Sequence, residues 1–229
     1  IARRAADSAG RKILVAGSAG PMSKSLSMGI DADRPDYRPV SFTEMEELYR
    51  EQIRGLQDGG ADFLLIETCF DPLNVKAAIK AWDSLGRKIP VAISASCSDA
   101  SGRVLTGQTL KAFYTAVKHC DPVAFGLNCS LGADRMLPLI REISSFASCP
   151  VICYPNAGLP DGMGNYSESP EETAAAVSDI VRCGYATIVG GCCGTTPEHI
   201  AAIRKAVEKL SPAPERIHPD RPDVLTVSG

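Results

Sequence analysis

Short apolar runs rich in β-favouring residues recur along this chain, and segments with helical spacing of apolar residues separate them. The runs occupy residues 12–17, 62–67, 90–94, 122–127, 150–153 and 186–190. After the first pair they recur roughly every thirty residues. Near-continuous apolar strands that alternate with amphipathic helices predict a parallel sheet covered by helices.

Helices are expected between these runs and after the last one. Apolar residues recur with helical spacing in residues 45–56, 75–82, 110–117 and 136–143. Ser169 with Glu172 forms a capping box that begins another helix, with proline at its first position. Thr196 is expected to cap the last helix, which begins at Pro197 and carries an apolar stripe.

Six strand–helix units fall two short of the eight that close a barrel. The chain begins at Ile1 with a predicted helix over residues 2–9, as if a strand had preceded it. We therefore predict an α/β fold, a (β/α)₈ TIM-type barrel whose first two βα units are absent from this sequence. A doubly wound sheet is the alternative, but residues 17–21 lack the glycine-rich phosphate turn typical of that fold.

The domain organisation follows from the same pattern. Residues 1–210 are expected to form one barrel domain, incomplete at its N-terminus. The proline-rich residues 211–229 are expected to form a linker toward a following domain.

Composition limits the cellular compartment and the kinds of partner that are expected. With 45% apolar and 22% charged residues, the chain has the composition of an ordinary soluble protein. No run approaches the ~20 apolar residues of a membrane span, and the first residues do not form a signal peptide, so a cytoplasmic location is expected. A net charge of −3 without a basic cluster provides no surface for nucleic acid or an anionic membrane.

The nine cysteines are an odd number, which argues against a disulfide framework. Cys192 and Cys193 are adjacent at the end of the last predicted strand, an arrangement that indicates metal binding. Neighbouring side chains on a regular strand point to opposite faces, so the two thiolates can converge only where the backbone leaves the pleat. Gly190, Gly191 and Gly194 would permit that bend.

In a barrel, functional residues lie where the strands end. Glu67, Cys129 and Asn156 each follow a predicted strand, as the cysteine pair does, and the glycine-rich residues 158–164 could cover a substrate. Three thiolates at this rim predict a zinc site whose fourth position is open to substrate. Such a site carries a charge of −1, which suits it to binding a thiol and keeping it nucleophilic. The nearest imidazole, His199, is expected at the surface.

Several motifs lie at the ends of the predicted strands. They are Ile66-Glu67-Thr68, Gly126-Leu127-Asn128-Cys129, Pro155-Asn156-Ala157-Gly158 and Gly190-Gly191-Cys192-Cys193-Gly194-Thr195-Thr196-Pro197. Together with residues 98–103 they resemble the homocysteine S-methyltransferase family, and the similarity covers about residues 12–210. Residues 98–103, with residues 106–109, look closest to the homocysteine-binding domain of cobalamin-dependent methionine synthases.

This resemblance implies a set of roles. Cys129, Cys192 and Cys193 would bind zinc, and the sulfur of homocysteine would take the fourth position. Glu67 would engage the ammonium group of the substrate, and Asn156 would lie beside the metal as a ligand when substrate is absent. Methylcobalamin would donate the methyl group from another domain, and folate-binding and cobalamin domains would be partners within the full-length protein.

Two departures and two alternatives accompany this resemblance. The family opens with a strand that carries an Asp-Gly-x-Met-Gly type motif and with a second strand, and neither is in this sequence. A related enzyme would use betaine or S-methylmethionine without cobalamin. A non-catalytic zinc-binding module would hold the metal without a thiol substrate.

Overall fold

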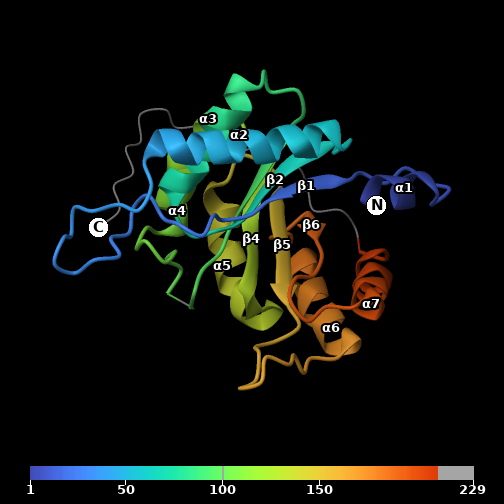
Figure 1. Ribbon diagram of the computed structural model, residues 1–229. Coiled ribbons are helices and arrows are strands. Elements are labelled where there is room, and N and C mark those ends of the chain that lie inside the picture. Colours follow the sequence, from blue (N-terminus) through green and yellow to red (C-terminus); the bar gives the residue numbers. More distant parts are fainter. Residues whose placement is uncertain (100, 211–229) are drawn as a thin grey trace.

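The computed structural model describes residues 1–99 and 101–210, which form a parallel sheet with its helices (Figure 1). The sheet contains six strands in the order of the sequence. The strands are β1 (Ala16–Ala19), β2 (Phe63–Cys69), β3 (Val91–Ala95), β4 (Ala124–Gly132), β5 (Val151–Asn156) and β6 (Ile188–Val189). The linker expected over residues 211–229 lies outside the described residues.

The strand order confirms the barrel prediction over the doubly wound alternative. Every strand pairs in parallel with the next strand in the sequence, and the order never reverses. A doubly wound sheet would instead reverse its order at a switch point. The sheet is not closed, because β1 and β6 are its two edges, so the described residues form part of a barrel.

The helices follow the predicted alternation. The described residues contain three capping boxes, at Ser41 with Glu44, at Ser169 with Glu172 and at Thr196 with His199, and Thr196 precedes Pro197 as predicted. Within the described residues no helix has both the length and the apolar character needed to cross a membrane. The helices are α1 (Ala2–Asp7), α2 (Phe42–Asp58), α3 (Pro72–Ser84), α4 (Leu110–Val117), the 3₁₀ helix η1 (Lys118–Cys120), α5 (Ala133–Phe146), α6 (Pro170–Arg182) and α7 (Pro197–Val207).

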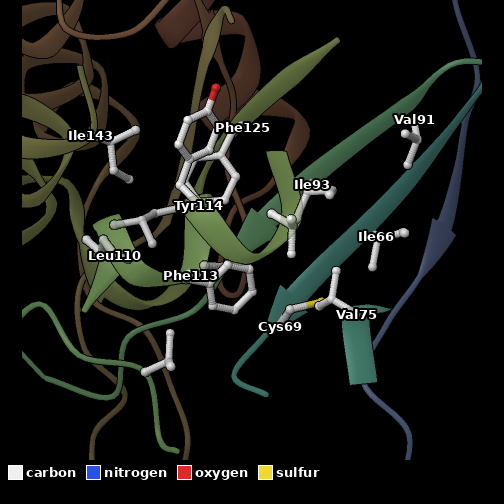
Figure 2. Packing of buried hydrophobic residues seen from close by; sticks show 14 of the residues in the cluster. Ile66, Cys69, Val75, Val91, Ile93, Leu110, Phe113, Tyr114, Phe125 and Ile143 are labelled. Carbon is white, nitrogen blue, oxygen red and sulfur yellow. The ribbon is translucent and has the colours of Figure 1, made fainter. Parts of the chain in front are cut away.

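Alternate residues of the strands belong to two separate apolar clusters. Ile66, Ile93 and Phe125 pack in the main core between sheet and helices, where Figure 2 shows them beside side chains of α3 and α4. Ala92, Ala124 and Ile152 form a second cluster with Phe63, Leu65 and Tyr154. Because strand side chains alternate between faces, this second cluster marks the inner face of the partial barrel.

The strand boundaries differ from the predicted runs at both ends of the sheet. The first run was predicted over residues 12–17, but β1 begins at Ala16. The backbone N–H of Val15 donates instead to the carboxylate of Asp62, at 2.6 Å. The last strand shortens to two residues, whereas β4 and β5 extend to Gly132 and Asn156. Cys129 and Asn156, which were predicted to follow strands, therefore belong to β4 and β5.

Candidate metal centre

Three cysteines converge at the carboxyl rim of the sheet. The sulfur atoms of Cys129, Cys192 and Cys193 all lie within 4.8 Å of one another. Cys193 Sγ is 3.7 Å from Cys129 Sγ and 4.0 Å from Cys192 Sγ. All nine cysteines of the chain are free thiols. The structure therefore brings together the three cysteines that the sequence singled out.

The donor set fits a zinc ion. Zn–S bonds of about 2.3 Å in a tetrahedron place the sulfur atoms about 3.8 Å apart. The two measured sulfur separations, 3.7 Å and 4.0 Å, bracket this value. With the third separation also within 4.8 Å, the three sulfurs can occupy three corners of a tetrahedral site.

Cys129 reaches the cluster because β4 is irregular at this point. Its pairing with β5 changes register between Asn128 and Gly132. Cys129 and Ser130 have left-handed φ values of 62° and 65°, which residues with a β-carbon seldom adopt. On a regular strand Cys129 would share the helix-covered face with Leu127, so the bulge redirects its side chain toward the rim.

The loop that carries the adjacent cysteines is held against the end of β5. Cys192 N–H donates to Pro155 O at 2.7 Å, and Ala157 N–H donates to Cys193 O at 2.9 Å. Of the three glycines expected to permit the bend, Gly194 has a left-handed φ of 79°. Gly191 allows close packing instead, because a β-carbon at this position would overlap the side chain of Thr195.

Asn156 lies beside the cluster but its amide oxygen is already engaged. The side chain is 2% exposed, and its Oδ1 accepts a hydrogen bond from the backbone N–H of Cys193 at 3.1 Å. In this arrangement Asn156 fixes the backbone of the cysteine loop. Its role as a substrate or metal ligand stays a prediction.

Glu67 lies at the end of β2, with each carboxylate oxygen hydrogen-bonded to a hydroxyl group. Oε1 accepts from Ser18, and Oε2 accepts from Tyr154 at 2.9 Å. Burial, with the nearby Glu67 charge, raises the pKa of Tyr154 well above its usual value, so this phenol stays a donor at neutral pH.

Four polar residues of the rim were missed in the sequence: Ser18, Ser94, Asn128 and Tyr154. Their signal is the two-residue period of the strands. Tyr154 alternates with Ile152 of the inner cluster, and Ser94 alternates with Ala92. Counting by two along each strand would have grouped these residues with Glu67 on the inner face.

Burial, with a smaller contribution from the neighbouring sulfurs, raises the pKa values of two of these thiols. Burial raises the pKa of Cys192 to about 12, and the neighbouring Cys129 adds to this rise. Burial likewise raises the pKa of Cys129, to which Cys193 contributes. Without a cation the two thiols therefore hold their protons at neutral pH, and a cation would have to displace them.

The expectation that His199 lies at the surface is wrong. The side chain is 6% exposed and Nδ1 accepts a hydrogen bond from Thr196 N–H at 3.2 Å. Nε2 therefore carries the proton and donates to Glu168 O at 3.0 Å. His199 replaces the usual acidic residue of a capping box and ties α7 to the loop before α6.

The loop between β5 and α6, residues 157–169, closes on itself beside the cluster. Glu168 N–H donates to Ala157 O at 3.3 Å, so the two ends of the loop meet. Tyr166 packs over the backbone of Gly194, where a β-carbon would overlap its ring. Figure 1 shows the rest of the loop projecting away from the sheet. Its role as a substrate cover stays a prediction.

The fold and the site define a parallel α/β-barrel type of protein with three thiols clustered at its carboxyl rim. A family model described as homocysteine S-methyltransferase matches residues 1–207. This chain belongs to the homocysteine S-methyltransferase family.

Solved structures agree with this assignment at the level of fold. The homocysteine methyltransferase MmuM from Escherichia coli is similar in its apo form, with a TM-score of 0.67 and 23% identity. Its metallated form matches with a TM-score of 0.68 and 23% identity. The matches cover 90% and 89% of this chain but 66% and 65% of those chains, so this chain spans about two thirds of their length.

Proposed function

We propose that this chain binds Zn²⁺ through Cys129, Cys192 and Cys193 and activates homocysteine for methylation to methionine. The observation that carries the proposal is the convergence of three sulfurs from β4 and the loop after β6 within 4.8 Å. Membership of the homocysteine S-methyltransferase family supports the choice of thiol substrate. Zinc, when bound, would lower the pKa of the substrate thiol and keep it as a nucleophilic thiolate.

The protein groups around the thiols would bind and orient the amino acid. Glu67 would accept the ammonium group, since its carboxylate is held at the same rim by Ser18 and Tyr154. Asn156 would keep Cys193 in place through its backbone N–H. The substrate would thus be held at both ends, which fixes the direction from which its sulfur meets a methyl group.

We propose methylcobalamin as the methyl donor, presented by a domain beyond the residues described here. The support is the resemblance of residues 98–103 and 106–109 to cobalamin-dependent methionine synthases. Methylcobalamin would supply the methyl group, and the homocysteine thiolate held at Cys129, Cys192 and Cys193 would be the nucleophile that accepts it. A folate-binding domain would be the source of the next methyl group.

Zinc-edge X-ray absorption on the intact protein, without and with homocysteine, tests the metal site. We expect a shell of three sulfurs and one lighter atom that becomes four sulfurs when homocysteine is added. Cys192→Ser should lose the metal. Cys183→Ser is the matched control, because Cys183 is exposed at the end of α6.

Two results would contradict parts of this proposal. A shell that ignores the added thiol would identify a non-catalytic zinc module. If methionine forms from betaine or S-methylmethionine and not from methylcobalamin, the proposed enzyme activity stands and the proposed methyl donor is wrong.

A further inference from the structure

The side chain of Asn128 uses all of its hydrogen-bonding capacity inside the protein. The residue is fully buried at the end of the regular part of β4. Its Oδ1 accepts hydrogen bonds from Thr68 N–H at 2.9 Å and from the Ser94 hydroxyl at 2.7 Å. Its Nδ2 donates to the Thr68 hydroxyl at 2.8 Å and lies 3.8 Å from Cys192 Sγ.

The network fixes which end of the Asn128 amide faces the sulfur. A backbone N–H can only donate, so the atom that faces Thr68 N must be the amide oxygen. The NH₂ group is then directed toward Cys192, and an N–H donor is the right partner for a sulfur that acts as a metal ligand. Reversing the amide would place two donors face to face at Thr68.

Cys192 lies beyond the paired part of the sheet, and the backbone hydrogen bonds that hold its loop leave the position of its sulfur to side-chain contacts. Strand β6 contains only two residues, and Cys192 lies in the loop beyond it. The backbone of Cys192 is tied to Pro155, but that bond does not fix the rotation of the side chain. Asn128 joins this sulfur to β2 and β3 through Thr68 and Ser94.

We propose that Asn128 is a positioning residue that orients the Cys192 sulfur for metal binding. This inference rests on the proposed zinc site and adds to it a residue that does not itself bind the metal. A residue that only joined the strands would affect folding but leave the metal affinity of the folded protein unchanged.

The test is the zinc affinity of Asn128→Asp in the intact protein, measured by competition with a chromophoric chelator. Aspartate keeps the shape and the Oδ1 acceptor but puts a negatively charged oxygen where the NH₂ group donates to the Thr68 hydroxyl and faces the sulfur. We expect affinity to fall about 10–100-fold, the usual effect of losing such a partner. The absorption of the Co²⁺-loaded protein should shift as well, which a purely structural role would not cause.

Asn74→Asp is the matched control, because Asn74 is also a buried amide, 3% exposed. Its side chain hydrogen-bonds to the backbone of Lys24 and Leu26 and does not contact the cysteines. It should keep the wild-type affinity. Ser94→Ala removes one anchor of Asn128 without touching the sulfur and should lower affinity by a smaller factor. It decides the question if Asn128→Asp does not fold.

The outcomes separate this inference from the proposed function. If Asn128→Asp keeps the wild-type zinc affinity and Co²⁺ spectrum, the positioning role is overturned and the zinc site stands. If Asn128→Asp does not fold, the same result in Ser94→Ala overturns it. A wild-type protein that binds no zinc would overturn both.

Discussion

The Tyr154 hydroxyl donates a hydrogen bond of 2.9 Å to Oε2 of Glu67, although 87 residues separate the two in the chain. The opposite oxygen of the carboxylate accepts from Ser18 on β1. The two oxygens are therefore oriented by residues of β1, which neighbours β2, and of β5, which does not. Each still has a lone pair for a further donor, as an ammonium group would be.

Tyr154→Phe should raise the KM for homocysteine by about ten- to a hundredfold, with a smaller change in kcat. A hydrogen bond to a charged group contributes about 1.5–3 kcal/mol, and here it orients the carboxylate that would bind substrate. Steady-state kinetics with varied homocysteine measures the split. Tyr114→Phe is the control, since the Tyr114 hydroxyl contacts Ser148 far from the rim. An unchanged KM in Tyr154→Phe would remove Glu67 orientation from the proposed mechanism.

Zinc affinity should fall as the pH is lowered. The pKa of Cys192 is raised to about 12 and that of Cys129 is also raised, so both thiols release a proton when a metal binds. Each released proton changes the affinity by about tenfold per pH unit, so Cys129 and Cys192 together give at least about a hundredfold per pH unit. Chelator competition between about pH 6 and pH 8 measures this slope. A flat profile would show that these thiols do not lose protons on binding.

Gly126→Ala should prevent or strongly impair folding. A β-carbon at this position would overlap the backbone of Ile152, its partner in β5. Backbone atoms of a central strand cannot move aside without breaking the ladder. Gly162→Ala is the matched control, because nothing lies within 4 Å of the added methyl group. The measurements are the soluble yield and the melting temperature of the two variants. Equal melting temperatures would contradict the close approach of β4 and β5.

His199→Ala should destabilise the fold by about 1–3 kcal/mol, since it removes the cap of α7 and leaves Glu168 O without its donor. Denaturant unfolding measures the difference. His119→Ala, at an exposed position, should be nearly neutral. If the two substitutions lower the free energy of unfolding equally, the buried hydrogen bonds of His199 between α7 and the loop before α6 contribute nothing to stability.

Much of this architecture could be predicted from local patterns. The alternation of apolar runs and amphipathic segments determined the parallel α/β class, because each strand must be buried on both faces and each helix on one. Ser169 and Thr196 determined where two helices begin, since capping depends on residues close in sequence. The glycine-flanked cysteine pair and the cysteine after the fourth strand pointed to one rim.

Only the tertiary structure decided how the rim is held together. The bulge at Cys129 depends on the register of β4 against β5. The contact of Asn128 with Cys192 and the bridge from Tyr154 to Glu67 join residues more than 60 positions apart. His199 shows the same limit, because its burial depends on a carbonyl 31 residues earlier in the chain. Helix starts and strand periodicity arise from neighbouring residues, whereas partners across the sheet exist only once the strands have paired.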